Sequence, residues 1–174
     1  MKSLTALAIS IPVLGVIATY LALGPLSGVY LIWAAFIFWG AFFAFGADIA
    51  ALQKIIVCGI FGALLAWLVA LAVLTVPLTP SLGLPLWAAL AVGAGVAVAV
   101  LAANISALAA IPATVLGIAS SFAYLLQTPE VLKADVLMSM TLKNSLIVIP
   151  LSVVAGSFFG LLSAKWGAAM TKAA

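Results

Sequence analysis

Long apolar runs follow one another along this chain, separated by short polar or proline-rich stretches. A helix rises about 1.5 Å per residue, so about 20 apolar residues match the roughly 30 Å hydrocarbon core of a bilayer. We therefore expect an all-α polytopic membrane protein that forms a single transmembrane domain, 1–174. Six spans are predicted, at about Leu4–Leu23, Val29–Gly46, Ala50–Leu74, Leu86–Ala103, Ser106–Leu126 and Asn144–Ala164.

The links between these spans carry residues that end helices, such as the glycines and proline of 24–28 and the prolines of the outer loop at 77–85. A longer polar stretch, 127–143, precedes the last span. There Thr128, Pro129 and Glu130 supply a hydroxyl cap, a proline at the first position and a carboxylate in the first turn. Apolar residues follow at helical spacing, which predicts a short helix lying in the membrane interface.

Lysines predict the orientation, because cytoplasmic loops carry an excess of Lys and Arg. With six spans, both termini lie on one side of the membrane. That side collects Lys2, Lys54, Lys165 and Lys172, whereas the other holds Lys133 and Lys143, offset by Glu130 and Asp135. Both termini are therefore expected to be cytoplasmic. The first apolar run is longer than the roughly 7–15 residues usual in a signal peptide, so we expect it to be retained as a span.

Composition excludes several kinds of chemistry. Hydrophobic residues make up 68% of the 174 residues and charged residues 5%, and the chain has one Cys and no His. Zinc sites and catalytic triads lack their usual ligands, and a disulfide within the chain is impossible. The six lysines are spread out, which does not suit a nucleic-acid groove. We expect no enzyme activity, no metal, no cofactor and no nucleic-acid partner.

The two halves of the chain, about 1–76 and 84–174, resemble each other weakly. The segment 36–45 aligns with 113–122, which pairs Gly40 with Gly117. The small-residue stripe of the third span recurs in the sixth span. These stripes are Cys58, Gly62, Ala66 and Ala70, and Ser152, Gly156, Gly160 and Ala164. Each half has three spans, so such halves would be inserted in opposite directions, as in the inverted 3+3 repeats of many transporters. Small residues also align by chance, and both explanations stay open.

Small residues one turn apart allow close helix packing in a membrane. We expect this role for Gly40, Gly62, Gly95, Gly117, Gly156 and Gly160. The packing is expected within the chain, and one stripe is also available to form a homo-oligomer.

The second span is unusually aromatic. Phe36, Trp39 and Phe43 share one face of the expected helix. Such rings are commonly filler or lipid contacts, but they can also narrow a pore to an apolar constriction that passes small neutral molecules. Both interpretations are kept.

Hydroxyl groups in the fifth span are the main candidates for polar contacts with a solute. Thr114, Ser120 and Ser121 follow Pro112, which is expected to free a backbone carbonyl in the preceding turn. The ordinary alternative is that each hydroxyl bonds a carbonyl of its own helix.

Asp48 is the acidic residue nearest to a span. It is expected to cap the third helix, although a carboxylate at membrane depth would suggest proton coupling. No other acidic residue falls inside a predicted span, so passive conduction is favoured over pumping.

Two segments resemble the YcdZ-like family, small bacterial inner-membrane proteins with a domain of unknown function. They are Trp33-Ala34-Ala35-Phe36-Ile37 with Phe43-Ala44, and Ile111-Pro112-Ala113-Thr114-Val115-Leu116-Gly117. This resemblance implies a bacterial inner membrane, and it implies no activity or site residues.

Together these patterns predict a homo-oligomeric channel or facilitator for a small neutral or weakly polar solute, the size of urea, an amide or a short acid. The path is expected between the two halves, with Phe36, Trp39 and Phe43 as the constriction and the three hydroxyls as hydrogen-bonding groups. Two alternatives remain: a proton-coupled transporter that uses Asp48 or Glu130, and a non-conducting partner of another membrane protein.

Overall fold

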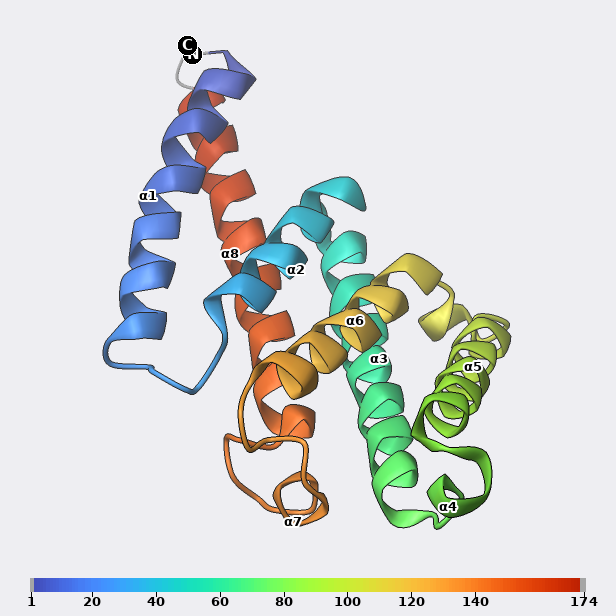
Figure 1. Ribbon diagram of the computed structural model, residues 1–174. Coiled ribbons are helices and arrows are strands. Elements are labelled where there is room, and N and C mark those ends of the chain that lie inside the picture. Colours follow the sequence, from blue (N-terminus) through green and yellow to red (C-terminus); the bar gives the residue numbers. More distant parts are fainter. Residues whose placement is uncertain (1, 173–174) are drawn as a thin grey trace.

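A computed structural model describes residues 2–172 of the chain, and within them all regular secondary structure is helical (Figure 1). The six longer helices are α1 (Ser3–Leu23), α2 (Ile32–Ala44), α3 (Ile49–Thr75), α5 (Leu84–Ala102), α6 (Ile111–Gln127) and α8 (Ser145–Lys172). Three short elements lie in the links: α4 (Thr79–Leu82), the 3₁₀ turn η1 (Ser106–Leu108) and α7 (Ala134–Leu137).

Helix length and composition mark the chain as a multi-pass membrane protein. Four helices, α1, α3, α5 and α8, are long and apolar enough to cross a membrane. The other two, α2 and α6, are shorter apolar helices of 13 and 17 residues. Every one of the six predicted spans therefore corresponds to a helix, but the second and fifth are shorter than predicted.

The fifth helix starts late because residues 106–108 form a separate 3₁₀ turn, and α6 begins only at Ile111. Pro112 consequently stands in the first turn of α6, where a proline removes no intrahelical hydrogen bond. The expectation that Pro112 frees a carbonyl inside the helix is wrong.

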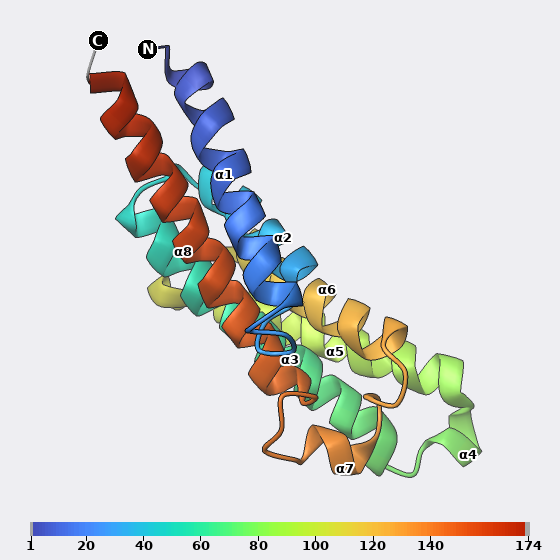
Figure 2. The same ribbon diagram turned by 90° about the vertical axis from the view of Figure 1, so that its left-hand side faces the viewer.

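The long helices α3 and α8 form the centre of the bundle and contact each other. The short helix α2 packs on α8, and the short helix α6 packs on α3. The outer helices follow the same rule, since α1 lies along α8 and α5 along α3. Figures 1 and 2 show α1 beginning beside the end of α8 at one end of the molecule, with α7 at the opposite end.

Glycines set the distance between crossing helices. A Cβ atom added to Gly62 of α3 would overlap the carbonyl oxygen of Thr114 in α6, and one added to Gly156 of α8 would overlap that of Ala35 in α2. An added Cβ at Gly117 would likewise overlap the carbonyl oxygen of Gly59. The backbones therefore touch at both crossings, as small-residue packing in membranes allows.

The other predicted packing glycines differ from these. An added Cβ would lie 2.9 Å from the ring of Phe42 at Gly160, and 2.6 Å from Val69 at Gly95. Gly40 is exposed and has nothing within 4 Å of such an atom, so it takes part in no close crossing among the described residues.

The polar stretch before α8 does not form the predicted interfacial helix. Thr128 is extended, Glu130 has a φ of 66°, and α7 is only four residues long. The reason is tertiary, because buried Leu137 draws the segment under the bundle, where its carbonyl accepts hydrogen bonds from the Trp67 indole and the Asn144 amide. The predicted helix start at Thr128 is therefore wrong.

Candidate functional site

Three hydroxyl side chains on α6 are buried without a hydrogen-bond partner. Thr114 and Ser121 have no exposed surface and Ser120 is 2% exposed, and none of their oxygens meets a donor or acceptor among residues 2–172. Leaving a buried polar group unpaired costs about 1–3 kcal/mol. By contrast, Ser157 of α8 donates to the Val153 carbonyl of its own helix, as an intramembrane serine usually does. The α6 hydroxyls therefore require an explanation.

The close helix crossing explains how two of these hydroxyls, those of Thr114 and Ser121, come to be enclosed. Thr114, Gly117 and Ser121 recur at helical spacing on one face of α6. That face lies against the glycines of α3, where the two backbones touch. With the backbones so close, Thr114 and Ser121 are enclosed between α6 and α3, whereas Ser120 is buried on another face of α6. We name Thr114, Ser120 and Ser121 the hydroxyl row.

The predicted aromatic constriction lies elsewhere in the molecule. Trp39 is stacked between Phe36 and Phe159, with ring centroids 5.7 and 5.5 Å apart, and its indole Nε1 donates to Ser163 Oγ at 2.9 Å. Ser10 of α1 donates to the Ser163 carbonyl at 3.0 Å. These side chains close the seam where α1, α2 and α8 meet.

The structure does not bring the aromatic set and the hydroxyl row together. The aromatic contacts run from α2 to α8, whereas the hydroxyl row lies on α6 against α3. Phe36 is 45% exposed, and Phe43 packs edge-on to Phe42. None of the three predicted constriction residues lines the apolar groove between α3, α5 and α6 or the cavities beside Asp48 and Lys54.

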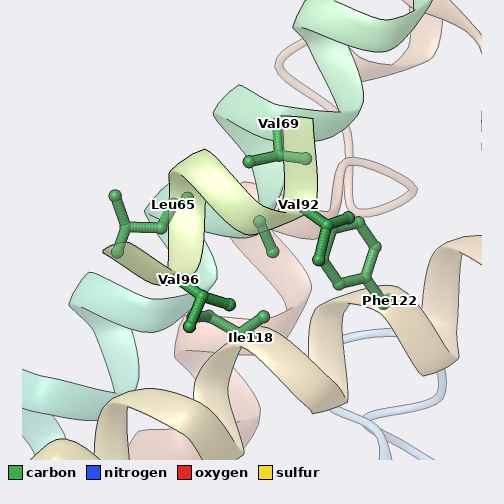
Figure 3. A pocket seen from close by; sticks show the side chains of 8 residues that line it. Leu65, Val69, Val92, Val96, Ile118 and Phe122 are labelled. Carbon is green, nitrogen blue, oxygen red and sulfur yellow. The ribbon is translucent and has the colours of Figure 1, made fainter. Parts of the chain in front are cut away.

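An apolar groove runs between α3, α5 and α6. Its wider part has a volume of about 490 Å³ and is lined by Val69, Ala70, Val73, Leu74, Leu84, Ala88, Val92, Phe122, Leu126 and Leu132. A narrow cleft continues from it, and Figure 3 shows Val92 and Val96 of α5 facing Ile118 and Phe122 of α6 there. Val69, Val92 and Phe122 line both parts, so they form one groove.

Two cavities at the other end of the bundle are more polar. One, of about 280 Å³, includes Asp48 and Lys165 beside Ala47, Ala164 and Ala168. The other, of about 490 Å³, includes Gln53, Lys54 and Ser106. Charged side chains therefore line the cavities at this end of the bundle.

The described acidic side chains have structural partners or are exposed. Asp48 Oδ1 accepts a hydrogen bond from the Ala51 backbone N–H at 2.7 Å, which confirms that Asp48 caps α3. Glu130 pairs with Lys133 in an exposed loop, and this hydrogen bond and charge raise the pKa of Lys133 above its usual value. Asp135 is exposed. Among residues 2–172 no cluster of three metal-binding side chains occurs.

Some residues of these seams were not singled out from the sequence. Ser163 lies at the end of the predicted sixth span, but α8 continues to Lys172 and thereby places Ser163 opposite α1. The groove residues are aliphatic, and no sequence signal separates an aliphatic residue that lines a groove from one that faces lipid. Trp39 and Phe159 form their stack through tertiary contact alone.

Comparison with known proteins gives a family. The model of a family described as "Protein of unknown function (DUF1097)" matches residues 8–168. No curated protein and no solved structure matches the chain. The resemblance to a family with a domain of unknown function is thus confirmed at that level, and the narrower YcdZ-like assignment stays a prediction. Because the match covers nearly the whole sequence, the chain belongs to the DUF1097 family.

Proposed function

We propose that the protein is a passive facilitator for a small neutral or weakly polar solute, of the size of urea or a short amide. The observation that carries this proposal is the hydroxyl row, three buried and unpaired hydroxyls within a bundle whose charges lie at its ends. A solute that carries an amide or carboxylic acid group supplies the missing partners as it passes. Hydroxyls provide such hydrogen bonds without introducing a charge into the membrane.

We further propose that the two halves are an inverted repeat, with a register defined by the helix crossings. Gly62 meets Thr114 as Gly156 meets Ala35, so Thr114 corresponds to Ala35 and Gly62 to Gly156. In this repeat α1, α2 and α3 correspond to α5, α6 and α8. The contacts between helices support it, because α2 packs on α8 as α6 packs on α3, and α1 packs on α8 as α5 packs on α3.

The same register relates four residues at the centre of the bundle. Gly117 corresponds to Phe38, and Gly59 to Val153. A Cβ atom added to Gly59 would lie 2.9 Å from Phe38 and 3.0 Å from Val153, and one added to Gly117 would overlap the backbone of Gly59. The four residues thus lie around one point, as residues related by a pseudo-two-fold axis do where they meet at that axis. The sequence alignment of Gly40 with Gly117 is two residues away from this register.

The register also relates cavities at opposite ends of the bundle. Ala47, Ala164 and Ala168 line the cavity beside Asp48. Their counterparts Leu126, Ala70 and Leu74 line the apolar groove. We propose that these two cavities are the ends of the solute route and that the hydroxyl row lies between them. Because the backbones touch at Gly62 and Gly117, the arrangement described is a closed one.

Passive transfer is favoured over proton coupling by the positions of the acidic groups. The Asp48 carboxylate is engaged in capping α3, and Glu130 lies in an exposed loop with Lys133. Neither residue lies beside the hydroxyl row. A proton relay needs a titratable group along the path. The proposed route has titratable groups only at its end cavity, where the Asp48 carboxylate is engaged in capping α3, and none is placed at the hydroxyl row.

We also propose the kind of membrane, the side on which the termini lie and the assembly of the protein. Lys2, Lys54 and Lys165 stand at the end of the bundle where α1 begins and α8 ends, and Lys172, whose side chain lies outside the described residues, follows them in the sequence. The lysine excess supports cytoplasmic termini in a bacterial inner membrane. A homo-oligomer is proposed because small-residue stripes allow close helix packing in a membrane.

The proposal is tested by uptake of urea and acetamide into liposomes that contain the purified protein. The triple variant Thr114→Val, Ser120→Ala, Ser121→Ala should lower the protein-dependent rate about tenfold or more, since each lost hydrogen bond is worth about 0.5–1.5 kcal/mol. Ser157→Ala is the matched control, because its hydroxyl is buried but paired within its helix. Equal rates for the triple variant and the wild type would remove the proposed function.

A further inference from the structure

We propose that α5 is a moving gate: its N-terminal half closes onto α3 and α6, turning about the contact between Gly95 and Val69, while α1 stays fixed on α8. This inference depends on the repeat register proposed above and makes no use of solute transfer. It concerns the apolar groove between α3, α5 and α6.

The first observation is that α5 is only thinly attached. Of its 19 residues, only Ala91 and Ala99 are buried. One tight contact with the bundle is at Gly95, where an added Cβ atom would lie 2.6 Å from Val69. Beyond this point the N-terminal half of α5 is separated from α3 by the wide part of the groove, about 490 Å³.

The second observation is that the present position of α5 leaves its one polar side chain unsatisfied. The indole Nε1 of Trp87 is buried and has no hydrogen-bond partner among the described residues. No other described side chain of α5 donates or accepts a hydrogen bond that would fix the helix to a neighbour. A buried, unpaired N–H disfavours this arrangement. The present position of α5 is therefore not fixed by a side-chain hydrogen bond among the described residues.

The third observation is the counterpart of α5, which shows what a closed position looks like. Ser10 of α1 meets Ser163, and Gly95 of α5 meets Val69, the residue that corresponds to Ser163. One turn further, Leu7 lies 3.0 Å from a Cβ atom added to Gly167. In the repeat register these residues correspond to Val92 and Val73.

Val92 and Val73 do not pack in this way but stand on the two walls of the groove. Closing α5 as α1 is closed brings them into contact. The segments on either side of α5 permit the movement. Gly83, directly before α5, has a φ of 76°, which glycine adopts without strain. The link after α5 contains only the short turn η1.

The test is disulfide cross-linking in liposomes on a Cys58→Ala background. The pair Val73→Cys with Val92→Cys should form a disulfide on oxidation, because closure brings the two Cα atoms within about 7 Å. The control pair Val73→Cys with Gly93→Cys should not, because Gly93 points into open space. Adding Ala88→Trp, which fills the groove, should slow the first cross-link at least tenfold. The pair Leu74→Cys with Leu84→Cys, on the same walls, serves if the first pair does not fold.

Two results would overturn the gate. One is the absence of both groove cross-links in folded protein, as expected if an acyl chain occupies the groove permanently. The other is equal cross-linking of positions 92 and 93 to position 73, as expected if α5 is simply detached. Because the readout is a covalent bond, the gate can stand while the proposed solute transfer fails, and the reverse also holds.

Discussion

The two outer helices, α1 and α5, each lie along one of the two central helices but are held there in different ways. At the α1 seam, Ser163 accepts a hydrogen bond from Ser10 at its carbonyl and another from Trp39 at its hydroxyl, and Trp39 is stacked between two phenylalanines. At the α5 seam, where α5 lies along α3 and α6, the position that corresponds to Ser163 in the proposed repeat is Val69, and only apolar side chains line the cleft. The glycine crossings thus bring the backbones of α3 and α6, and of α8 and α2, into contact, and among the described residues α1 has a side-chain hydrogen bond to its central helix that α5 lacks.

The energies of the individual contacts support this contrast between the α1 and α5 seams. At the α1 seam, one hydrogen bond, from Ser10 to the Ser163 carbonyl, joins α1 directly to α8 and is worth about 0.5–1.5 kcal/mol. The hydrogen bond from Trp39 to Ser163 and the stack of Trp39 on Phe159 join α2 to α8. The α5 seam has no such term, and a groove of about 490 Å³ replaces contact along half of its length. This contrast is why we propose α5, and not α1, as the helix that moves.

The largest expected effect is at the crossings, which the two halves share. Gly62→Leu and Gly156→Leu should each destabilise the protein by more than about 4 kcal/mol, because a side chain there meets a backbone carbonyl that cannot yield. Gly40→Leu is the control and should remain folded. Unfolding in detergent measures the difference. A stable Gly62→Leu protein beside an unfolded Gly156→Leu protein would break the proposed equivalence.

A smaller effect is expected at the position where the halves differ. Ser163→Ala should cost about 1–3 kcal/mol, because it removes the acceptor of the buried Trp39 N–H. Val69→Ala, at the position that corresponds in the proposed repeat, should cost less than about 1.5 kcal/mol, since it loosens the apolar contact with Gly95 but leaves no buried polar group without a partner. The same unfolding experiment compares the two variants, and equal losses would contradict the contrast between the seams.

The cap of α3 gives a still smaller effect. Asp48→Ala should cost about 1 kcal/mol through loss of the hydrogen bond from Ala51, whereas Asp48→Asn should keep most of the stability. Solute uptake by Asp48→Asn should equal that of the wild type between about pH 5 and 8, where a proton-coupled carrier would change. A collapse of uptake in this variant would favour the coupled mechanism.

The smallest expected effect on stability is at the hydroxyl row, and its sign is informative. Thr114→Val removes a buried hydroxyl that has no partner, so the free energy of unfolding should stay equal or rise by about 1 kcal/mol. The rate of solute uptake should nevertheless fall. A loss of stability instead would mean that Thr114 serves the fold.

The sequence predicted those features that depend on local pattern. The stripes around Gly62 and Gly156, the cap at Asp48 and the existence of six apolar helices follow from spacing and residue type. The fate of the stretch after Thr128 did not, because buried Leu137 and its hydrogen bonds overrode a good helix-start signal. The role of Trp39 was also beyond local pattern, since its partners Phe159 and Ser163 are distant in the sequence.

The groove was equally hidden from the sequence. Val92 looks like any lipid-facing residue of an apolar helix, and only the position of α5 makes it one wall of a cavity. The hydroxyl row was visible as three candidate residues, but their lack of partners depends on the close crossing of α6 with α3.

The most direct test of the account measures solute uptake after locking each outer helix in place. Liposomes carrying the Leu7→Cys, Gly167→Cys pair or the Val73→Cys, Val92→Cys pair are compared before oxidation, after oxidation and after reduction. We predict unchanged uptake when α1 is locked, and loss of uptake when α5 is locked, with recovery on reduction. Unchanged uptake with α5 locked, or loss of uptake with α1 alone locked, would contradict the account.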